Sequence, residues 1–123
     1  MRKFARIGLE MEFTRLARSE LSISRIGLGC EQLGGFDWGL VEEKRAMAAV
    51  ERAVALGINL FDTANIYGLG RSEILLSQAL GQRRYDMVIS TKCGLSWKAS
   101  GNGSRAATYV DAGPKNIVES IEG

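Results

Sequence analysis

The sequence predicts an α/β protein built on parallel β-strands. Two short apolar runs, Ile58–Phe61 and Met87–Ile89, alternate with segments of helical spacing, which is typical of β-α-β units with right-handed crossovers. Each run ends in polar residues: Asp62 follows the first, and Ser90–Lys92 follow the second. Because side chains at the carboxyl ends of parallel strands form active sites in such proteins, these residues predict a site at one edge of the sheet.

Two shorter elements are expected ahead of these strands. Glu12–Leu16 and Leu21–Ile23 are short alternating runs separated by a polar turn, a pattern that favours a β-hairpin. The run Arg25–Leu28 then predicts the first strand of the parallel sheet. The hairpin is therefore expected to precede the β-α-β rhythm.

Glycines and an aromatic residue follow the first expected strand. Gly29 and Cys30 lie at its C-terminal end, but position 32 is Gln32, so the dinucleotide-binding pattern G-x-G-x-x-G is not met. Taken alone, the glycine permits a tight turn from strand to loop. Trp38 lies in the loop beyond, and an aromatic residue there lines a substrate pocket as often as it covers the core. Trp38 is therefore a candidate substrate-pocket residue.

Two helices are expected between the strands. Glu42–Leu56 has an apolar face at helical spacing and is followed by Gly57, which suits the C′ position. The second helix runs from Ser72, as N-cap, through Leu80, with Glu73 favourably placed in its first turn and Gly81 at its end. The predicted apolar face of the first helix comprises Ala46, Met47, Ala49, Val50, Ala53 and Val54, and neighbouring faces of the second carry Ile74, Leu75, Gln78 and Ala79.

The last third of the chain is expected to hold one strand, one loop and one helix. Asp86–Thr91 is predicted to be the third strand, and Gly94–Gly113 is predicted to be a long loop. Loops of this length are usually functional or disordered. Pro114 suits the first position of a third helix, Lys115–Glu122. The expected order is therefore three parallel strands with two helices and the start of a third.

The composition excludes several classes of protein. The 123 residues suffice for one domain, and a net charge of +2 with scattered Lys and Arg argues against nucleic-acid binding. No apolar run of about 18 residues is present to span a membrane, and the basic start lacks the apolar stretch of a signal peptide, so a cytoplasmic location is expected. Two cysteines, no C-x-x-C and no histidine predict no metal site.

Three blocks of the chain together resemble one family, the aldo-keto reductases. They are Gly27–Cys30, Gly57–Gly68 and Ile89–Gly94, in this order and spacing. The resemblance implies an incomplete (β/α)8 TIM barrel, because a whole barrel needs about 250 residues. It also implies that residues 1–10 are an N-terminal extension and that residues 11–123 are the amino-terminal portion of the barrel.

The resemblance also implies a catalytic set. In the family a tetrad of Asp, Tyr, Lys and His surrounds the substrate carbonyl; the first three map onto Asp62, Tyr67 and Lys92, and the chain has no histidine to serve as the fourth. A phenol gives up its proton with a pKa near 10 in water, and a nearby ammonium eases that loss. Tyr67 is thus the expected acid, Lys92 is the cation that eases its proton loss, and Asp62 is the partner of the lysine. Taken singly, these residues fit plain roles better: a turn cap, a loop aromatic and a solvated strand end.

The same resemblance implies a cofactor and a reaction. Gly29, Cys30, Asp62 and Lys92 would border the nicotinamide end of NADPH, where Gly29 lets the ring approach the backbone. The expected function is NADPH-dependent reduction of aldehydes or ketones, with the 123 residues inactive by themselves. The alternatives are a non-catalytic NADP-binding regulatory subunit on the same fold and an inactive truncated gene product. Cys93 is either a reactive thiol beside Lys92 or, by preference, a buried inert one.

A three-stranded piece of a barrel is expected to bind either other copies of itself or the rest of the barrel. Its two open edges present unpaired backbone groups, and Leu28, Leu60 and Ile89 are expected to point inward, exposed for lack of the opposite wall. The isolated chain is therefore expected to self-associate or to need the rest of the barrel.

Overall fold

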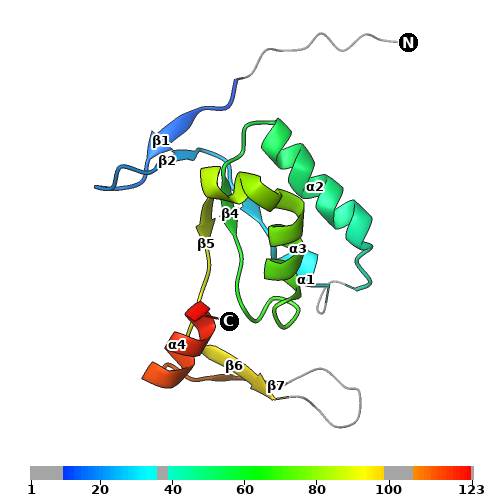
Figure 1. The fold of residues 1–123 in the computed structure, drawn as a ribbon, viewed down its shortest axis with the longest axis vertical. Helices are drawn as coiled ribbons and strands as arrows, with labels where there is room; N and C mark the ends of the chain where they lie inside the picture. The colour runs from blue at the N-terminus through cyan, green and yellow to red at the C-terminus, as the bar shows by residue number, and fades with distance from the viewer. Residues whose placement is uncertain (1–9, 36–38, 99–106, 123) are drawn as a thin grey trace.

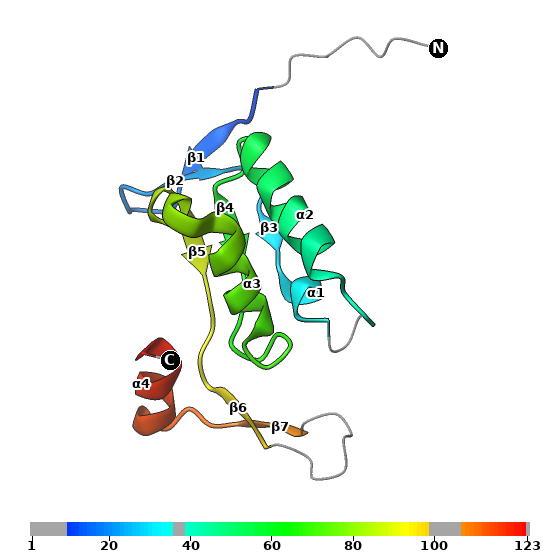
Figure 2. The same cartoon turned by 45° about the vertical axis from the view of Figure 1, so that its right-hand side comes forward.

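The computed structural model describes residues 10–35, 39–98 and 107–122. A small sheet covered by helices occupies the middle of the molecule, a β-hairpin lies at one end, and a second hairpin with the last helix lies at the other (Figures 1 and 2). Residues 1–9 of the expected extension, and Trp38, lie outside the described residues.

The central sheet has three parallel strands in sequential order. They are β3 (Leu28–Gly29), β4 (Leu60–Asp62) and β5 (Val88–Ser90), hydrogen-bonded in the order β3-β4-β5. The predicted fold class, an unclosed piece of a parallel α/β barrel, is confirmed. The strands are shorter than expected; in particular, the first comprises only the last residue of the predicted run and the glycine after it.

The register of the sheet decides which side chains face the helices. Leu28, Phe61 and Ile89 pair across the three strands, and Phe61 is fully buried in the core beneath the helices. Since residues paired across strands point to the same face, Leu28 and Ile89 share that face. The expectation that both point inward with Leu60 was therefore wrong: Leu60 occupies the opposite face, one residue out of phase.

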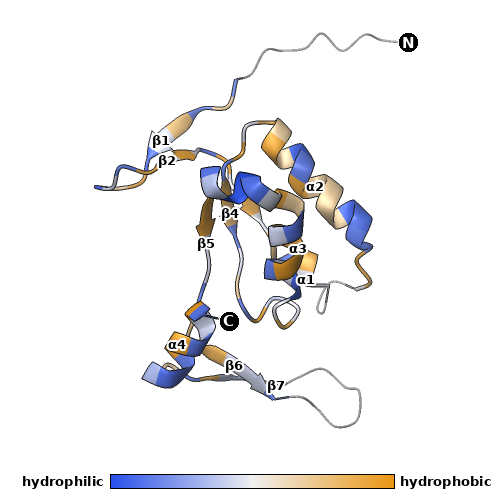
Figure 3. Ribbon diagram, in the orientation of Figure 1, coloured by the Kyte–Doolittle hydropathy of each residue, from blue (hydrophilic) through white to orange (hydrophobic). Residues whose placement is uncertain are grey.

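Two helices cover one face of this sheet. They are α2 (Glu43–Ala55) and α3 (Arg71–Leu80), which pack against each other. A single-turn helix that was not predicted, α1 (Glu31–Gly34), packs against α3. Figure 3 shows hydrophobic and hydrophilic residues alternating along both long helices. The buried core formed by the helices and sheet comprises Cys30, Leu33, Ala46, Val50, Ala53, Phe61, Leu75, Leu76, Ala79 and Leu80.

The predicted helix ends were right in part. Gly57 (φ +86°) and Gly81 (φ +53°) both end helices in positive-φ conformations, as expected. The N-cap of α3 is Gly70 instead of Ser72, which lies inside the first turn with its hydroxyl engaged elsewhere. The predicted faces were also partly wrong, because Ile74, Gln78 and Ala49 are exposed, whereas Leu76 and Leu80 are buried.

The expected N-terminal hairpin is confirmed. It consists of β1 (Phe13–Arg15) and β2 (Ser22–Ser24), paired antiparallel. Asn59 joins it to the central sheet: its Oδ1 accepts from the backbone N–H of Ser24 at 2.7 Å, and its own N–H donates to Ser24 Oγ at 3.1 Å. The hairpin is thus fixed to the residue just before β4.

The segment expected as one long loop contains a second hairpin. After the 3₁₀-helix η1 (Gly81–Asp86) and β5, strands β6 (Leu95–Lys98) and β7 (Ala107–Val110) pair antiparallel, so the prediction of Gly94–Gly113 as a loop was wrong. Aromatic residues paired with polar neighbours, Trp97 with Thr108 and Tyr109 with Ser96, account for the strands. The helix α4 (Pro114–Glu122) follows as predicted.

Candidate active site

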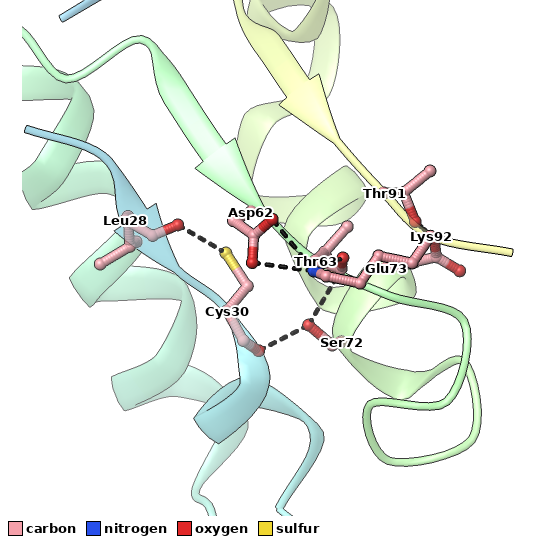
Figure 4. A network of polar contacts seen from close by, with 8 residues as sticks. All are labelled: Leu28, Cys30, Asp62, Thr63, Ser72, Glu73, Thr91 and Lys92. Carbon is pink, nitrogen blue, oxygen red and sulfur yellow. Dashed lines mark hydrogen bonds and ion pairs between the residues drawn. The ribbon is translucent and has the colours of Figure 1, made fainter. Parts of the chain in front are cut away.

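Asp62 and Lys92 form an ion pair at the carboxyl edge of the central sheet. Asp62 is the last residue of β4, and Lys92 lies two residues beyond β5. Lys92 Nζ donates to both carboxylate oxygens of Asp62, at 3.0 and 2.9 Å, and to the carbonyl oxygen of Thr63 at 2.8 Å (Figure 4). Both side chains are about half exposed, at 46 % for Lys92 and 49 % for Asp62. The ammonium is thus fixed by three acceptors but still open to a ligand.

This environment favours the charged form of Lys92. Burial acts to lower the pKa of the ammonium, but hydrogen bonds to Asp62 and Tyr67 and the charge of Asp62 outweigh it, so the pKa is raised above its ordinary value of 10.5. Hydrogen bonds to the charged form and opposite charges nearby have this effect in general. Lys92 is therefore cationic throughout the neutral range.

Tyr67 lies beside the ion pair, in the loop between β4 and α3. Its ring centroid is 4.9 Å from Lys92 Nζ. Its backbone N–H donates to the carbonyl of Ala64 at 3.1 Å, and its carbonyl accepts from the N–H of Ser72 at 3.1 Å. The loop is therefore tied both to the end of the strand and to the helix that follows.

Gly29 faces open space next to Asp62. The two residues pair in the register of β3 and β4, and a Cβ built on Gly29 would meet no atom within 4 Å. Gly29 has no positive φ, so no turn requires a glycine here. The bare backbone leaves room for a flat group to lie against the strand end.

The two cysteines differ in exposure. Cys93 is exposed, so the preference for a buried, inert thiol at this position was wrong. Cys30 is the buried thiol: burial, aided by the charge of Asp62 and opposed by that of Lys92, raises its pKa to about 11. Its backbone N–H donates to the carbonyl of Asp62 at 2.8 Å, which ties the ends of β3 and β4 together.

The structure therefore brings together Gly29, Cys30, Asp62, Tyr67 and Lys92. Sequence reasoning missed four further polar residues that adjoin them: Thr63, Ser72, Glu73 and Thr91 (Figure 4). The signal available was their position, since each lies next to a strand end or in the first turn of α3. Three of the four carry a hydroxyl group, and hydroxyl or carboxylate side chains at such positions are too common to indicate a site.

A cavity of about 730 Å³ opens beside Lys92, between the end of β5 and helices α3 and α4. Lys92 lines this cavity, whereas Gly29, Asp62 and Tyr67 do not. The residues that line it are Gly70, Glu73, Ile74, Ser77, Gln78, Thr91, Lys92, Cys93, Ser120 and Ile121.

Two further features are absent from the described residues. None of their helices has the length and apolar character needed to cross a membrane. Nor do the same residues contain a group of three or more His, Cys, Asp or Glu side chains arranged to hold a metal ion.

Known proteins resemble both the sequence and the fold. The chain is 38 % identical over 112 residues to the oxidoreductase YqkF of Bacillus subtilis, covering 91 % of this chain and 33 % of that protein. It is 34 % identical to the NADH-specific methylglyoxal reductase of Escherichia coli, over 86 % of this chain and 35 % of that one. A glycerol dehydrogenase from Gluconobacter oxydans superposes with a TM-score of 0.77 at 30 % identity, covering 89 % of this chain and 33 % of that structure.

The chain thus spans about a third of the length of these relatives. The region that matches contains the ion pair, the tyrosine beside it and the three parallel strands. Residues 25–122, which are most of the chain, match the aldo/keto reductase family, and the chain therefore belongs to this family.

Proposed function

We propose that this chain is the amino-terminal part of an NADPH-dependent reductase that converts aldehydes or ketones to alcohols. The observation that carries the proposal is the position of Lys92 Nζ, bonded to both oxygens of Asp62 and 4.9 Å from the centre of the Tyr67 ring. Carbonyl reduction needs a proton delivered to oxygen as hydride reaches carbon. A phenol next to a fixed ammonium suits the delivery of that proton.

Each of the three residues has a distinct task in this proposal. Tyr67 donates its phenolic proton to the substrate oxygen. Lys92, held in its cationic form, stabilises the negative charge that develops on the phenolic oxygen. Asp62 fixes the ammonium through two hydrogen bonds, so that the charge does not need to reorganise during the reaction.

The residues at the strand ends fit the nicotinamide end of the cofactor. Gly29 offers open space opposite Asp62, where a side chain would occupy the room that a planar ring needs. We propose that Gly29, Asp62 and Lys92 border the ring there, with Cys30 supporting the strand end from the buried side. The cofactor, when bound, supplies the hydride.

The remaining parts of the site are proposed to lie outside these 123 residues. The chain contains no histidine for the fourth position of the catalytic set, and it spans about a third of its relatives. We therefore propose that the 123 residues alone are inactive. The preference for NADPH is likewise a proposal, and the relative named as NADH-specific makes the comparison of the two cofactors part of the test.

The test is carbonyl-dependent oxidation of NADPH, and separately of NADH, by the protein that carries this chain, with simple aldehydes and ketones as substrates. The expected result is turnover that Tyr67→Phe lowers by at least about a hundredfold, the usual scale for losing a general acid, while the affinity for the cofactor is retained. Tyr85→Phe is the matched control, because Tyr85 is 72 % exposed in η1.

Two results would separate this proposal from its rivals. Full turnover in Tyr67→Phe would remove Tyr67 from the role of acid. Tight binding of NADPH without any turnover on a broad carbonyl panel would favour a non-catalytic, cofactor-binding subunit on the same fold.

A further inference from the structure

The first turn of α3 contacts the ends of all three strands of the central sheet. Ser72 Oγ donates to the carbonyl oxygen of Cys30, just after β3, at 2.6 Å. The same Oγ lies 3.0 Å from Thr63 Oγ1, just after β4. Glu73 Oε1 accepts from Thr91 Oγ1, just after β5, at 2.6 Å (Figure 4). Two neighbouring residues of one helix thus meet every strand end that adjoins the ion pair.

The direction of the buried hydrogen bonds follows from proton count. A serine hydroxyl carries one proton, and Ser72 gives it to the carbonyl of Cys30. Thr63 must therefore be the donor in the contact with Ser72. Ser72 is 0 % exposed and Thr63 1 % exposed, so water cannot replace either hydroxyl as a hydrogen-bond partner.

Both contacts lead to groups that hold Lys92. The backbone N–H of Thr63 donates to the carbonyl of Ser90 at 2.8 Å, and its carbonyl accepts from Lys92 Nζ at 2.8 Å. Thr91, which donates to Glu73, immediately precedes Lys92 in the chain. Moving either strand end would change the distance between the ammonium and its acceptors.

The short strands give these contacts their importance. β3 has two residues and β4 and β5 have three each, so few ladder hydrogen bonds fix the strand ends. Ser72 also makes no N-cap hydrogen bond, since Gly70 occupies that position, so its hydroxyl serves the tertiary contact. Side chains with this geometry are suited to fix the strand ends where the ladder stops.

We propose that Ser72 and Glu73 are positioning residues for Lys92: Ser72 acts through Thr63 and Glu73 acts through Thr91, and together they keep the ammonium bonded to Asp62. The catalytic value of this positioning rests on the function proposed above, but the positioning itself is measurable without any activity.

The experiment measures the acylation of individual lysines by mass spectrometry as a function of pH, at low protein concentration, on the 123-residue chain. An amine reacts only when unprotonated, so the rate of Lys92 relative to exposed Lys44 reports how firmly the proton is held on Lys92. In Thr63→Val and Ser72→Ala we expect this ratio to rise at least about threefold, the equivalent of half a pKa unit. Thr63→Ser, which keeps the hydroxyl, should retain the wild-type ratio.

Exposed variants keep the test decisive if the buried ones do not fold. Thr91→Val removes the contact with Glu73 at an exposed position, and Thr91→Ser preserves it, so only the valine variant should raise the ratio. Ser77→Ala, on the exposed side of the same helix, should leave it unchanged. A wild-type ratio in Thr91→Val and in the folded Thr63 and Ser72 variants overturns the proposal, as does an equal rise in valine and serine variants. The expected ratios, together with no carbonyl-dependent turnover by the protein that carries this chain, would instead count against the proposed function alone.

Discussion

The backbones of Gly34 and Gly68 are in direct contact, although 34 positions separate them in the chain. A Cβ built on Gly68 would lie 2.2 Å from the carbonyl oxygen of Gly34, and one built on Gly34 would lie 2.5 Å from the N atom of Gly68. Gly68 also has a φ of +60°. The loop that carries Tyr67 is therefore seated against the one-turn helix α1 by a contact that only two glycines permit.

Gly68→Ala should destabilise the fold and displace Tyr67. The added Cβ meets backbone, which cannot rotate away, and the positive φ disfavours alanine, so a loss of about 1–3 kcal/mol in the free energy of unfolding is expected. Urea unfolding followed by circular dichroism measures it. Gly29→Ala is the control, because its Cβ meets nothing within 4 Å. Equal stability of Gly68→Ala and wild type would show that the loop moves away from α1 at no cost in stability.

Gly29 should matter for the cofactor and not for the fold. Gly29→Leu is expected to change the free energy of unfolding by no more than about 0.5 kcal/mol, since the site is open. Its bulk would occupy the space opposite Asp62, so we expect the affinity for NADPH to fall at least about tenfold, or 1.4 kcal/mol. Fluorescence titration of the protein that carries this chain gives the dissociation constant. Unchanged affinity would place the nicotinamide elsewhere.

Alkaline pH should destabilise the chain, mainly through Cys30. Burial raises the pKa of this thiol from 9.0 to about 11, so above about pH 9 the unfolded chain releases a proton that the folded chain retains, and the free energy of unfolding falls with rising pH. Lys92 acts in the same direction at higher pH. Its raised pKa makes a contribution that is complete below 10.5 and is lost as pH rises through the folded value.

Unfolding midpoints in urea measured from pH 7 to pH 11 check this. Cys30→Ala should flatten the decline that begins near pH 9. Cys93→Ala is the matched control, because Cys93 is exposed. An identical pH profile for Cys30→Ala and wild type would show that the thiol titrates normally.

The isolated chain is expected to self-associate. β5 forms an edge of the central sheet and is coloured mainly as hydrophobic in Figure 3. Its residue Ile89 is 42 % exposed. Edge strands with free backbone groups pair with other chains, and each covered apolar side chain gains about 1.5–3 kcal/mol. Sedimentation at micromolar concentration should show oligomers that Ile89→Lys reduces.

Leu56→Lys is the control for this prediction. Leu56 is 51 % exposed just after α2 and does not line the cavity at the end of β5, so its replacement should leave the oligomers in place. A cooperatively melting monomer in the unmodified chain would contradict the expectation.

The β-α-β rhythm and the meeting of Asp62 with Lys92 could be predicted from the sequence. Apolar runs of strand length alternate with helical periodicity, and parallel strands necessarily bring their carboxyl ends to one edge. The helix-ending glycines, Gly57 and Gly81, were also predictable, because local backbone geometry sets their role. These features depend on interactions within or between neighbouring elements.

The tertiary structure decided what depends on distant neighbours. Ser72 looked like an N-cap because local propensity favours serine there, yet its hydroxyl serves Cys30, which lies 42 positions earlier in the chain. Phe61 and Asp62 are adjacent in sequence but lie on opposite faces, one in the core and one in the site, and only the sheet register fixes which is which. A one-residue shift in register would exchange them, and the packing of Phe61 beneath α2 and α3 prevents that shift.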